Sequence, residues 1–261
     1  GMLVGYAKNC QIKNIDVSVG NSSNIYLLSE LGSDGGNAGV GLLVGYIEGS
    51  TDLAGVGGRT SFINGVNVTG TSSKYVIIND YSNRSMPTGG IIGSAKRGTY
   101  VSSITMTSLN MQIGGEDSST TGYAGGVAGY CSDSYFEIIE IRSANNYART
   151  DEKKGVIIHG SQATGGAIGY ANNSEISFVT LYGLFRMRGT SAGGVAGVNT
   201  GLIRDCYITA PKTSTDDGMR LMFDQSNGHN ASISDFGGIV GLNEGTVTDC
   251  GITGGNGAAA Y

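Results

Sequence analysis

The chain contains 261 residues, of which 46 are Gly and 2 are Pro, and its formal net charge is −5. Collagen is excluded because there is no strict Gly-X-Y period, and a disordered chain is excluded because 39% of the residues are hydrophobic and only 14% are charged. The acidic balance and the absence of a Lys/Arg cluster indicate that nucleic acid is not a partner. No apolar run approaches the roughly 18 residues of a membrane-spanning helix, so we expect no membrane insertion.

A short apolar run closed by Gly recurs seven times along the chain. The copies are residues 3–5, 42–45, 90–93, 126–129, 166–169, 194–197 and 238–241. The intervals between successive closing glycines are 40, 48, 36, 40, 28 and 44 residues. A constant motif at variable intervals predicts one repeated structural unit with loops of different length inserted into it.

A second apolar pattern follows each run. The last two copies match at identical offsets, with Asn199, Ile203, Cys206 and Ile208 corresponding to Asn243, Val247, Cys250 and Ile252. Equivalent triplets in the other copies are Ile12/Ile15/Val17, Val101/Ile104/Met106, Phe136/Ile139/Ile141 and Ile176/Val179/Leu181, and the second copy offers the pair Val66 and Val68. These short segments of Val, Ile, Thr and Tyr between Gly and Asn predict β-strands.

A third strand in each unit is predicted at residues 25–28, 75–78, 156–158 and 219–223. Polar stretches around these strands, at 29–39, 79–88, 114–122, 143–155 and 211–235, predict surface loops, which are the places where binding specificity usually resides. No window has sustained 3.6-residue periodicity, so no long helix is expected. The glycines supply either positive φ at tight corners or room for close backbone approach.

A unit of this size cannot bury its own apolar residues, whereas a stack of units can. The sequence therefore predicts one all-β domain over residues 1–261, a parallel β-solenoid (a right-handed β-helix) of about six to seven coils. Open strand edges at the ends of a solenoid are normally capped. We therefore expect flanking domains of a longer chain, or end-to-end contacts between solenoids.

The pattern Gly-Gly-apolar-apolar-Gly-x-Asn-x-Gly-x-Ile-x-x-Cys, clearest at 194–208 and 238–252, resembles the GLUG motif. Weaker copies extend the resemblance over nearly the whole chain. GLUG repeats are typical of bacterial surface and secreted proteins, including adhesin-like proteins, and they accompany the peptidase domains of some immunoglobulin A1 proteases. The resemblance implies a bacterial extracellular or cell-surface β-solenoid and names no ligand.

Tyrosine follows the closing Gly in four copies. These residues are Tyr6, Tyr46, Tyr130 and Tyr170, while Ser94, Val198 and Leu242 occupy the same position elsewhere. Equivalent positions in stacked coils form ladders. An exposed tyrosine ladder would dock sugar rings, because each ring joins an apolar face to a hydroxyl; a ladder packed under loops would be purely structural. We take these four residues as the candidate ligand-binding site.

Two other matched pairs favour structural roles. Asn199 and Asn243 fall at a turn, where stacked amides can hydrogen-bond between coils. Cys206 and Cys250 lie close enough in a stack for a disulfide, but their pattern favours buried free thiols that act as small apolar residues. Cys10 and Cys131 do not share matched offsets.

Catalytic and metal-binding patterns are weak. A zincin needs HExxH, and neither His159 nor His229 begins that motif. The matched Asp205 and Asp249, and the group Asp133, Glu137 and Glu140, would have to converge for polysaccharide chemistry, whereas strand alternation predicts outward, solvated side chains. Asp34-Gly35-Gly36 and Asp216-Asp217-Gly218 do not continue as calcium-binding motifs. We therefore predict no catalytic residue, no metal and no cofactor.

The sequence interpretation is a non-enzymatic segment of a bacterial cell-surface or secreted protein, an adhesin that binds host or environmental glycans or proteins. Two alternatives stay open at this stage. One is a polysaccharide-processing β-helix enzyme. The other is a ligand-free rigid stalk attached to a peptidase domain.

Overall fold

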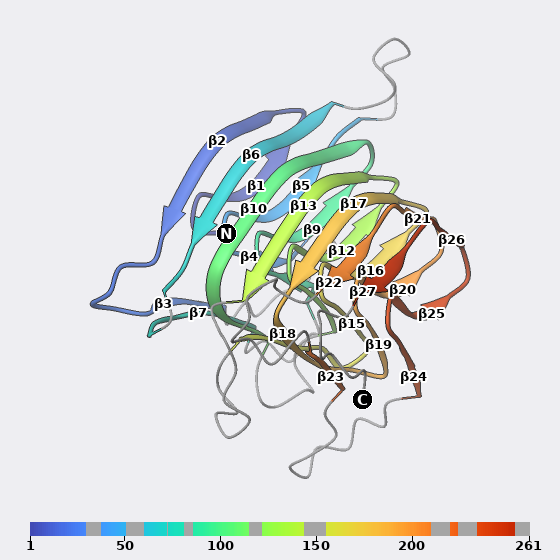
Figure 1. The fold of residues 1–261 in the computed structure, drawn as a ribbon. Coiled ribbons are helices and arrows are strands. Elements are labelled where there is room, and N and C mark those ends of the chain that lie inside the picture. The colour runs from blue at the N-terminus through green and yellow to red at the C-terminus, as the bar shows by residue number, and fades with distance from the viewer. Residues whose placement is uncertain are drawn as a thin grey trace.

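The computed structural model describes residues 1–29, 38–50, 60–71, 73–80, 86–114, 122–143, 155–209, 220–223 and 234–253. Within these ranges the chain is all-β, with 27 strands and no helix (Figure 1). Consequently, the described part of the chain offers no helical segment with the length and hydrophobicity that a bilayer crossing requires. The named strands pair in parallel with their counterparts in adjacent coils.

The strands stack into four faces, which we call sheets A to D. Sheet A contains β1 (Val4–Lys8), β5 (Val44–Glu48), β9 (Ile92–Lys96), β12 (Ala128–Ser132), β16 (Ile168–Asn172), β20 (Ala196–Asn199) and β25 (Val240–Asn243). Sheet B contains β2 (Gln11–Ser18), β6 (Ser61–Thr69), β10 (Thr99–Ile113), β13 (Tyr135–Ser143), β17 (Glu175–Tyr182), β21 (Leu202–Arg204), β22 (Tyr207–Thr209), β26 (Thr246–Thr248) and β27 (Gly251–Thr253).

The other two faces are narrower. Sheet C is continuous with sheet B through β10 and contains β3 (Ile25–Ser29), β7 (Tyr75–Asp80), β14 (Val156–His159), β18 (Leu184–Arg188) and β23 (Arg220–Phe223). Sheet D contains β4 (Val40–Gly41), β8 (Thr88–Gly89), β11 (Tyr123–Gly125), β15 (Ala163–Gly165), β19 (Ser191–Gly193) and β24 (Asp235–Gly237).

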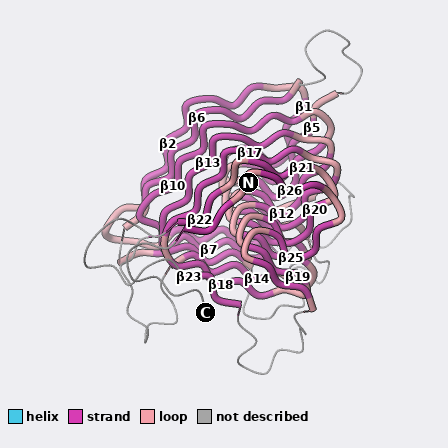
Figure 2. The backbone as a smooth tube through the Cα atoms, turned by 45° about the vertical axis from the view of Figure 1, so that its right-hand side comes forward, coloured by secondary structure: helices cyan, strands magenta, loops and turns pink. Residues whose placement is uncertain are grey.

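Each coil runs through sheets D, A, B and C in that order, as β15, β16, β17 and β18 illustrate. The described strands belong to seven successive coils, and Figure 2 shows their backbones stacked one above another. The fold is therefore a parallel β-solenoid, as the sequence predicts. Its core is a continuous column of apolar side chains between the sheets.

The predicted apolar triplets form this column in register. Ile139 pairs with Ile104 on one side and Val179 on the other, and Ile203 pairs with Ile176. Val66, which the sequence offers as one of a pair rather than in a triplet, pairs with both Ile15 and Ile104. The alignment of repeats deduced from the sequence is thus confirmed strand by strand.

The Gly-Gly-apolar-apolar-Gly segment contains the corner between sheets D and A, where the sequence places tight corners. The first Gly ends a strand of sheet D, the next two residues bend, and sheet A then begins. Positive φ is not the reason for glycine at this bend, since Gly166 does not have it. A Cβ on Gly166 would lie 2.1 Å from the carbonyl oxygen of Gly194 in the next coil, so glycine is required for close approach.

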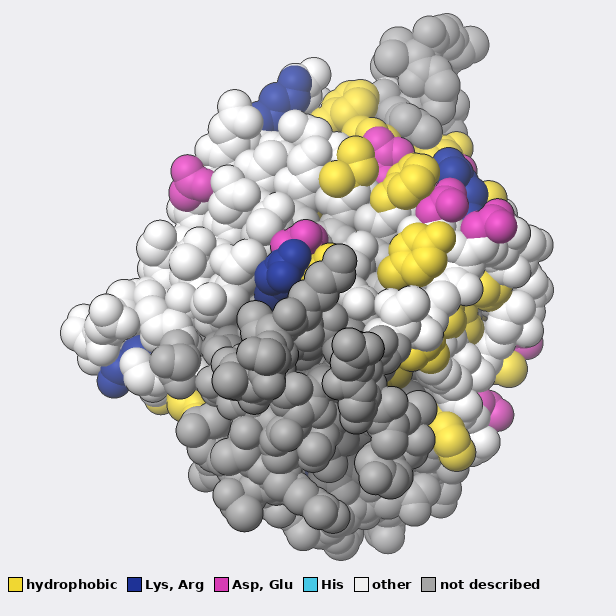
Figure 3. All heavy atoms as spheres, in the orientation of Figure 1, with side chains coloured by type: hydrophobic (Ala, Val, Ile, Leu, Met, Phe, Trp, Pro, Cys, Tyr) yellow, Lys and Arg dark blue, Asp and Glu magenta, His cyan; other side chains and the backbone are white. Residues whose placement is uncertain are grey.

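Positive φ occurs at turns between sheets A and B, as at Asn9, Asp133 and Asn173, and also in the middle of sheet B, once in every coil. The residues that adopt it in the middle of sheet B are Asn14, Gly65, Ser103, Ile138, Phe178, Asp205 and Asp249. Each lies one residue before an inward apolar side chain, which explains why the first two members of each triplet are three residues apart. These residues form one column, which we call the bend column. Sheet B faces the viewer in Figures 1 and 3.

The predicted third strands are all present as β3, β7, β14 and β23. Two further segments belong to this face: β18 and the second half of β10. Neither has a sequence signal that separates it from the preceding strand of sheet B. Half or more of each predicted surface loop lies outside the described residues, and so do Asp34-Gly35-Gly36, Asp216-Asp217-Gly218 and His229.

Candidate functional site

The predicted tyrosine ladder exists as a column on the outward face of sheet A. Tyr6 pairs with Tyr46, and Tyr130 pairs with Tyr170. The residues that follow them, such as Ile47 and Ala171, lie in the core, so strand alternation turns the tyrosines outward. The two pairs are separated by one coil, where Ser94 occupies the column.

Lys96 occupies the space beside Ser94. Its side chain lies on the same face of β9, and its Nζ is 5.6 Å from the ring centroid of Tyr46 and 5.4 Å from that of Tyr130. A cation near two ring faces is stabilised by both. Lys96 therefore connects the two halves of the column across the coil that lacks a tyrosine.

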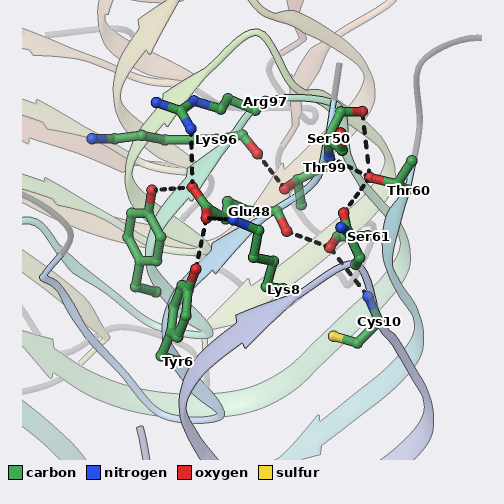
Figure 4. Close-up of polar contacts among 12 residues, drawn as sticks. Tyr6, Lys8, Cys10, Glu48, Ser50, Thr60, Ser61, Lys96, Arg97 and Thr99 are labelled. Carbon is green, nitrogen blue, oxygen red and sulfur yellow. Dashed lines mark hydrogen bonds and ion pairs between the residues drawn. The ribbon is translucent and has the colours of Figure 1, made fainter. Parts of the chain in front are cut away.

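The first half of the column centres on a buried carboxylate, Glu48 of β5. It accepts hydrogen bonds from the hydroxyl groups of Tyr6, at 2.6 Å, and Tyr46, at 3.1 Å. Lys8 Nζ lies 3.0 Å from it and Arg97 Nη1 lies 3.6 Å from it. Figure 4 shows Tyr6 and Lys8 of the first coil and Arg97 of the third converging on Glu48 of the second. The carboxylate is fully occupied by partners.

The electrostatics follow from these contacts. The hydrogen bond from Tyr6 is the largest cause that lowers the pKa of Glu48 to about 2, followed by that from Lys8. Burial, together with the bond to Glu48, raises the pKa of Tyr46 well above its usual value. A carboxylate so strongly held in its charged form does not serve as a general acid near neutral pH. This half of the column therefore connects three successive coils through Glu48 and has a structural role.

The second half of the column is an aromatic cluster. Tyr123 of sheet D joins Tyr130 and Tyr170, and the three ring centroids are 5.3 to 5.8 Å apart. All three side chains are partly exposed. Asn172 donates from Nδ2 to the hydroxyl of Tyr130 at 3.4 Å. Partly open rings with an amide and an ammonium group beside them form an amphipathic surface.

The four predicted residues therefore differ in accessibility. The side chain of Tyr6 is 52% exposed, whereas that of Tyr46 is 2% exposed, so the ring of Tyr46 is closed to a ligand. Tyr130 and Tyr170 are partly exposed. The sequence interpretation missed Tyr123, Glu48 and Lys96. Glu48 and Lys96 lie two residues beyond the ladder position, on the same strand face, and this spacing is a signal that could have indicated them.

The Asn and Cys predictions have clear outcomes. Asn199 donates to Asn243 Oδ1 at 2.8 Å and accepts from the amide of Gly201, so the amides do bridge coils.

All four cysteines are free, which confirms the preference for thiols over a disulfide. Burial raises the pKa of Cys131 to about 12, which makes this thiol unreactive.

The outward carboxylates are engaged by neighbours. Glu140 pairs with Arg142 at 2.5 Å, and Arg204 pairs with both Glu175 and Asp205 at 3.0 Å. Asp249 is exposed in the bend column beside Asp205, as strand alternation predicts. The part of the chain that the structure describes holds no group of three or more potential metal ligands.

Comparison of this chain with protein-family models, with curated proteins and with solved structures gives no match. The fold and the geometry of the column therefore carry the functional argument, and the resemblance to the GLUG motif stays a prediction.

Proposed function

We propose that this chain is a non-enzymatic, adhesive segment of a bacterial surface or secreted protein, and that Tyr123, Tyr130 and Tyr170 bind glycans. The observation that carries the proposal is the aromatic cluster that these three rings form on a rigid sheet face. The bacterial and extracellular part of the proposal rests on the resemblance to GLUG repeats.

The chemistry of the cluster suits a sugar. A pyranose ring has an apolar face of C–H groups and an edge of hydroxyl groups. Tyrosine rings complement the face, while Asn172, Lys96 and the phenol hydroxyls complement the edge. The backbone beneath is fixed by parallel pairing to the coils on both sides, so little conformational entropy is lost on binding.

The state of the carboxylates supports a non-enzymatic role. Glycoside hydrolysis needs two carboxyl groups, one of which exchanges a proton near neutral pH. Glu48 is held ionised by its partners, and Glu140, Glu175 and Asp205 are paired with arginines. The enzyme alternative is therefore less favoured by the described side chains.

The stalk alternative predicts that the tyrosines are packed away from solvent. Tyr46 fits that expectation, but Tyr6 is half exposed and Tyr130 and Tyr170 are partly exposed. The accessible rings favour binding over a purely structural ladder.

The test is an array of host and dietary glycans, with mucin and matrix proteins, probed with the wild-type chain and with Tyr130→Ala and Tyr170→Ala. The matched control is Tyr26→Ala, because Tyr26 is 58% exposed on sheet C and lies outside the column. We expect saturable binding that both column variants lose and the control keeps, with unchanged circular dichroism. Absence of binding at concentrations that detect millimolar affinity would contradict the proposal.

A further inference from the structure

The bend column of sheet B contains two residues that do not suit its backbone geometry. Five coils place Asn, Gly, Ser or Asp there, which are small or can hydrogen-bond locally. The fourth and fifth coils place Ile138, with φ of 55°, and Phe178, with φ of 54°. Positive φ is uncommon for any residue with a side chain and is a clear outlier for a β-branched or bulky one.

These two residues are neighbours on the surface. The residues flanking them pair directly, Glu137 with Ser177 and Ile139 with Val179. Ile138 is 55% exposed and Phe178 is 48% exposed. Each therefore combines backbone strain with exposed apolar area, while the adjacent coils show that the fold accepts Ser103 and Asp205 at this position. Strain that folding does not require points to a function.

The surroundings extend the apolar area. Phe62, Tyr100 and Tyr135 form a second column on the same face, and Tyr207 is exposed in the next coil. Figure 3 shows hydrophobic side chains gathered on this face over β6, β10, β13 and β17, with acidic side chains among them. The patch lies on sheet B and is distinct from the tyrosine column of sheet A.

The charges around the two residues are mainly negative. Four carboxylates lie within three residues of the pair or in the adjacent coil: Glu137, Glu140, Glu175 and Asp205. They are accompanied by two guanidinium groups, those of Arg142 and Arg204, which pair with three of them. The guanidinium of Arg204 also lies over the ring of Phe178, with Cζ 5.4 Å from the ring centroid. The remaining carboxylate, Glu137, accepts a hydrogen bond from Tyr100. Among the described contacts, Glu137 forms no ion pair with a Lys or Arg side chain. The rim therefore has a net negative charge.

We propose that Ile138 and Phe178 are the centre of a docking surface for a basic protein segment, in which apolar side chains alternate with Lys or Arg. Two observations select this occupant. The aliphatic Ile138 offers no ring for a sugar to stack on, whereas clustered apolar anchors are typical of protein contacts. The negative rim complements cationic flanks. This proposal is independent of glycan binding by sheet A.

The probe is a fluorescent peptide of alternating Lys and Leu, compared with a Lys–Ser peptide and a Glu–Leu peptide by fluorescence anisotropy. The wild-type chain is compared with the double variant Ile138→Asn/Phe178→Asn. The matched control is Leu28→Asn, which removes a 52% exposed apolar side chain from sheet C, away from the patch. Thermal unfolding of every variant accompanies the binding curves.

We expect the Lys–Leu peptide to bind the wild type and the control at least tenfold more tightly than the double variant, with weaker binding at high salt. The other two peptides should bind at least tenfold more weakly than Lys–Leu. The double variant should melt at a higher temperature, because Asn tolerates positive φ. The loss of binding would then not reflect unfolding.

Three results would overturn the proposal. The first is equal binding of the three peptides, or equal loss in the double variant and in Leu28→Asn. The second is a lower melting temperature of the double variant, which would mean that the two side chains serve the fold. The third is self-association of the wild type that the double variant abolishes, or glycan binding that it loses, since either assigns the patch to a different occupant.

Discussion

Replacement of Gly129 by Ala should destabilise the solenoid, and the chain contains a matched control for this substitution. Gly129 lies in sheet A at the register position that Gly5 occupies in the first coil, and neither residue has positive φ. A Cβ on Gly129 would lie 2.3 Å from the amide nitrogen of Thr88 and 2.7 Å from the carbonyl carbon of Pro87. A Cβ on Gly5 would meet nothing within 4 Å.

The magnitude follows from these distances. The atoms that a Cβ on Gly129 meets are backbone, so sheets A and D would have to separate by roughly 1 Å to restore ordinary van der Waals contact. Overpacking of this kind costs about 1–3 kcal/mol, and backbone neighbours place Gly129→Ala near 3 kcal/mol. Gly5→Ala should instead stabilise the chain by about 0.4–1 kcal/mol, because Ala restricts the unfolded chain. The two variants should differ by about 3–4 kcal/mol.

The assay is urea unfolding followed by far-ultraviolet circular dichroism and by tyrosine fluorescence, since the chain has 14 Tyr and no Trp. Equal m-values for the two variants would show that the same surface unfolds in each, so that the difference in midpoint reports stability. If Gly129→Ala proves as stable as Gly5→Ala, close packing of sheets A and D is not the reason for glycine at this position.

Three further predictions concern single residues. The pKa of Glu48 is lowered to about 2, so its contribution to stability is present above the unfolded-state pKa near 4.5 and is lost as pH falls toward 2. In Glu48→Gln the melting temperature should therefore depend less on pH between about 4.5 and 2. A pH dependence equal to that of the wild type would refute this. In the folded chain, a thiol reagent should modify the partly exposed Cys10 well before the buried Cys131, and equal labelling by mass spectrometry would contradict the burial. Asn199→Ala should lower the free energy of unfolding in urea by about 1–3 kcal/mol, because the fully buried amide of Asn199 hydrogen-bonds to the next coil. Asn243 is exposed, so Asn243→Ala should lower it by less, and the reverse order would rule the argument out.

Much of the fold could be predicted from the sequence because its determinants repeat. Strand alternation and stacking place Ile104, Ile139 and Val179 at equivalent positions, so their spacing alone gives the register. The same reasoning predicts the column of Tyr130 and Tyr170. The glycines at the corner between sheets D and A were expected too, but the sequence left two reasons for them open, positive φ or close approach. Only the backbone of the neighbouring coil, which a Cβ on Gly166 would meet, decides for close approach.

The sequence by itself determined the solenoid, the alignment of its coils and the residues that stack. Only the tertiary structure decided which of those residues are open to solvent. Tyr6 and Tyr46 are equivalent in sequence, yet one is half exposed and the other is buried against Glu48 and Lys96. The backbone strain at Phe178 also could not be predicted from the sequence, because the positive φ of Phe178 is imposed by pairing with the coils on both sides. Local pattern fixes which position a side chain takes in a coil, whereas accessibility and strain depend on contacts between segments about 30 to 50 residues apart in sequence.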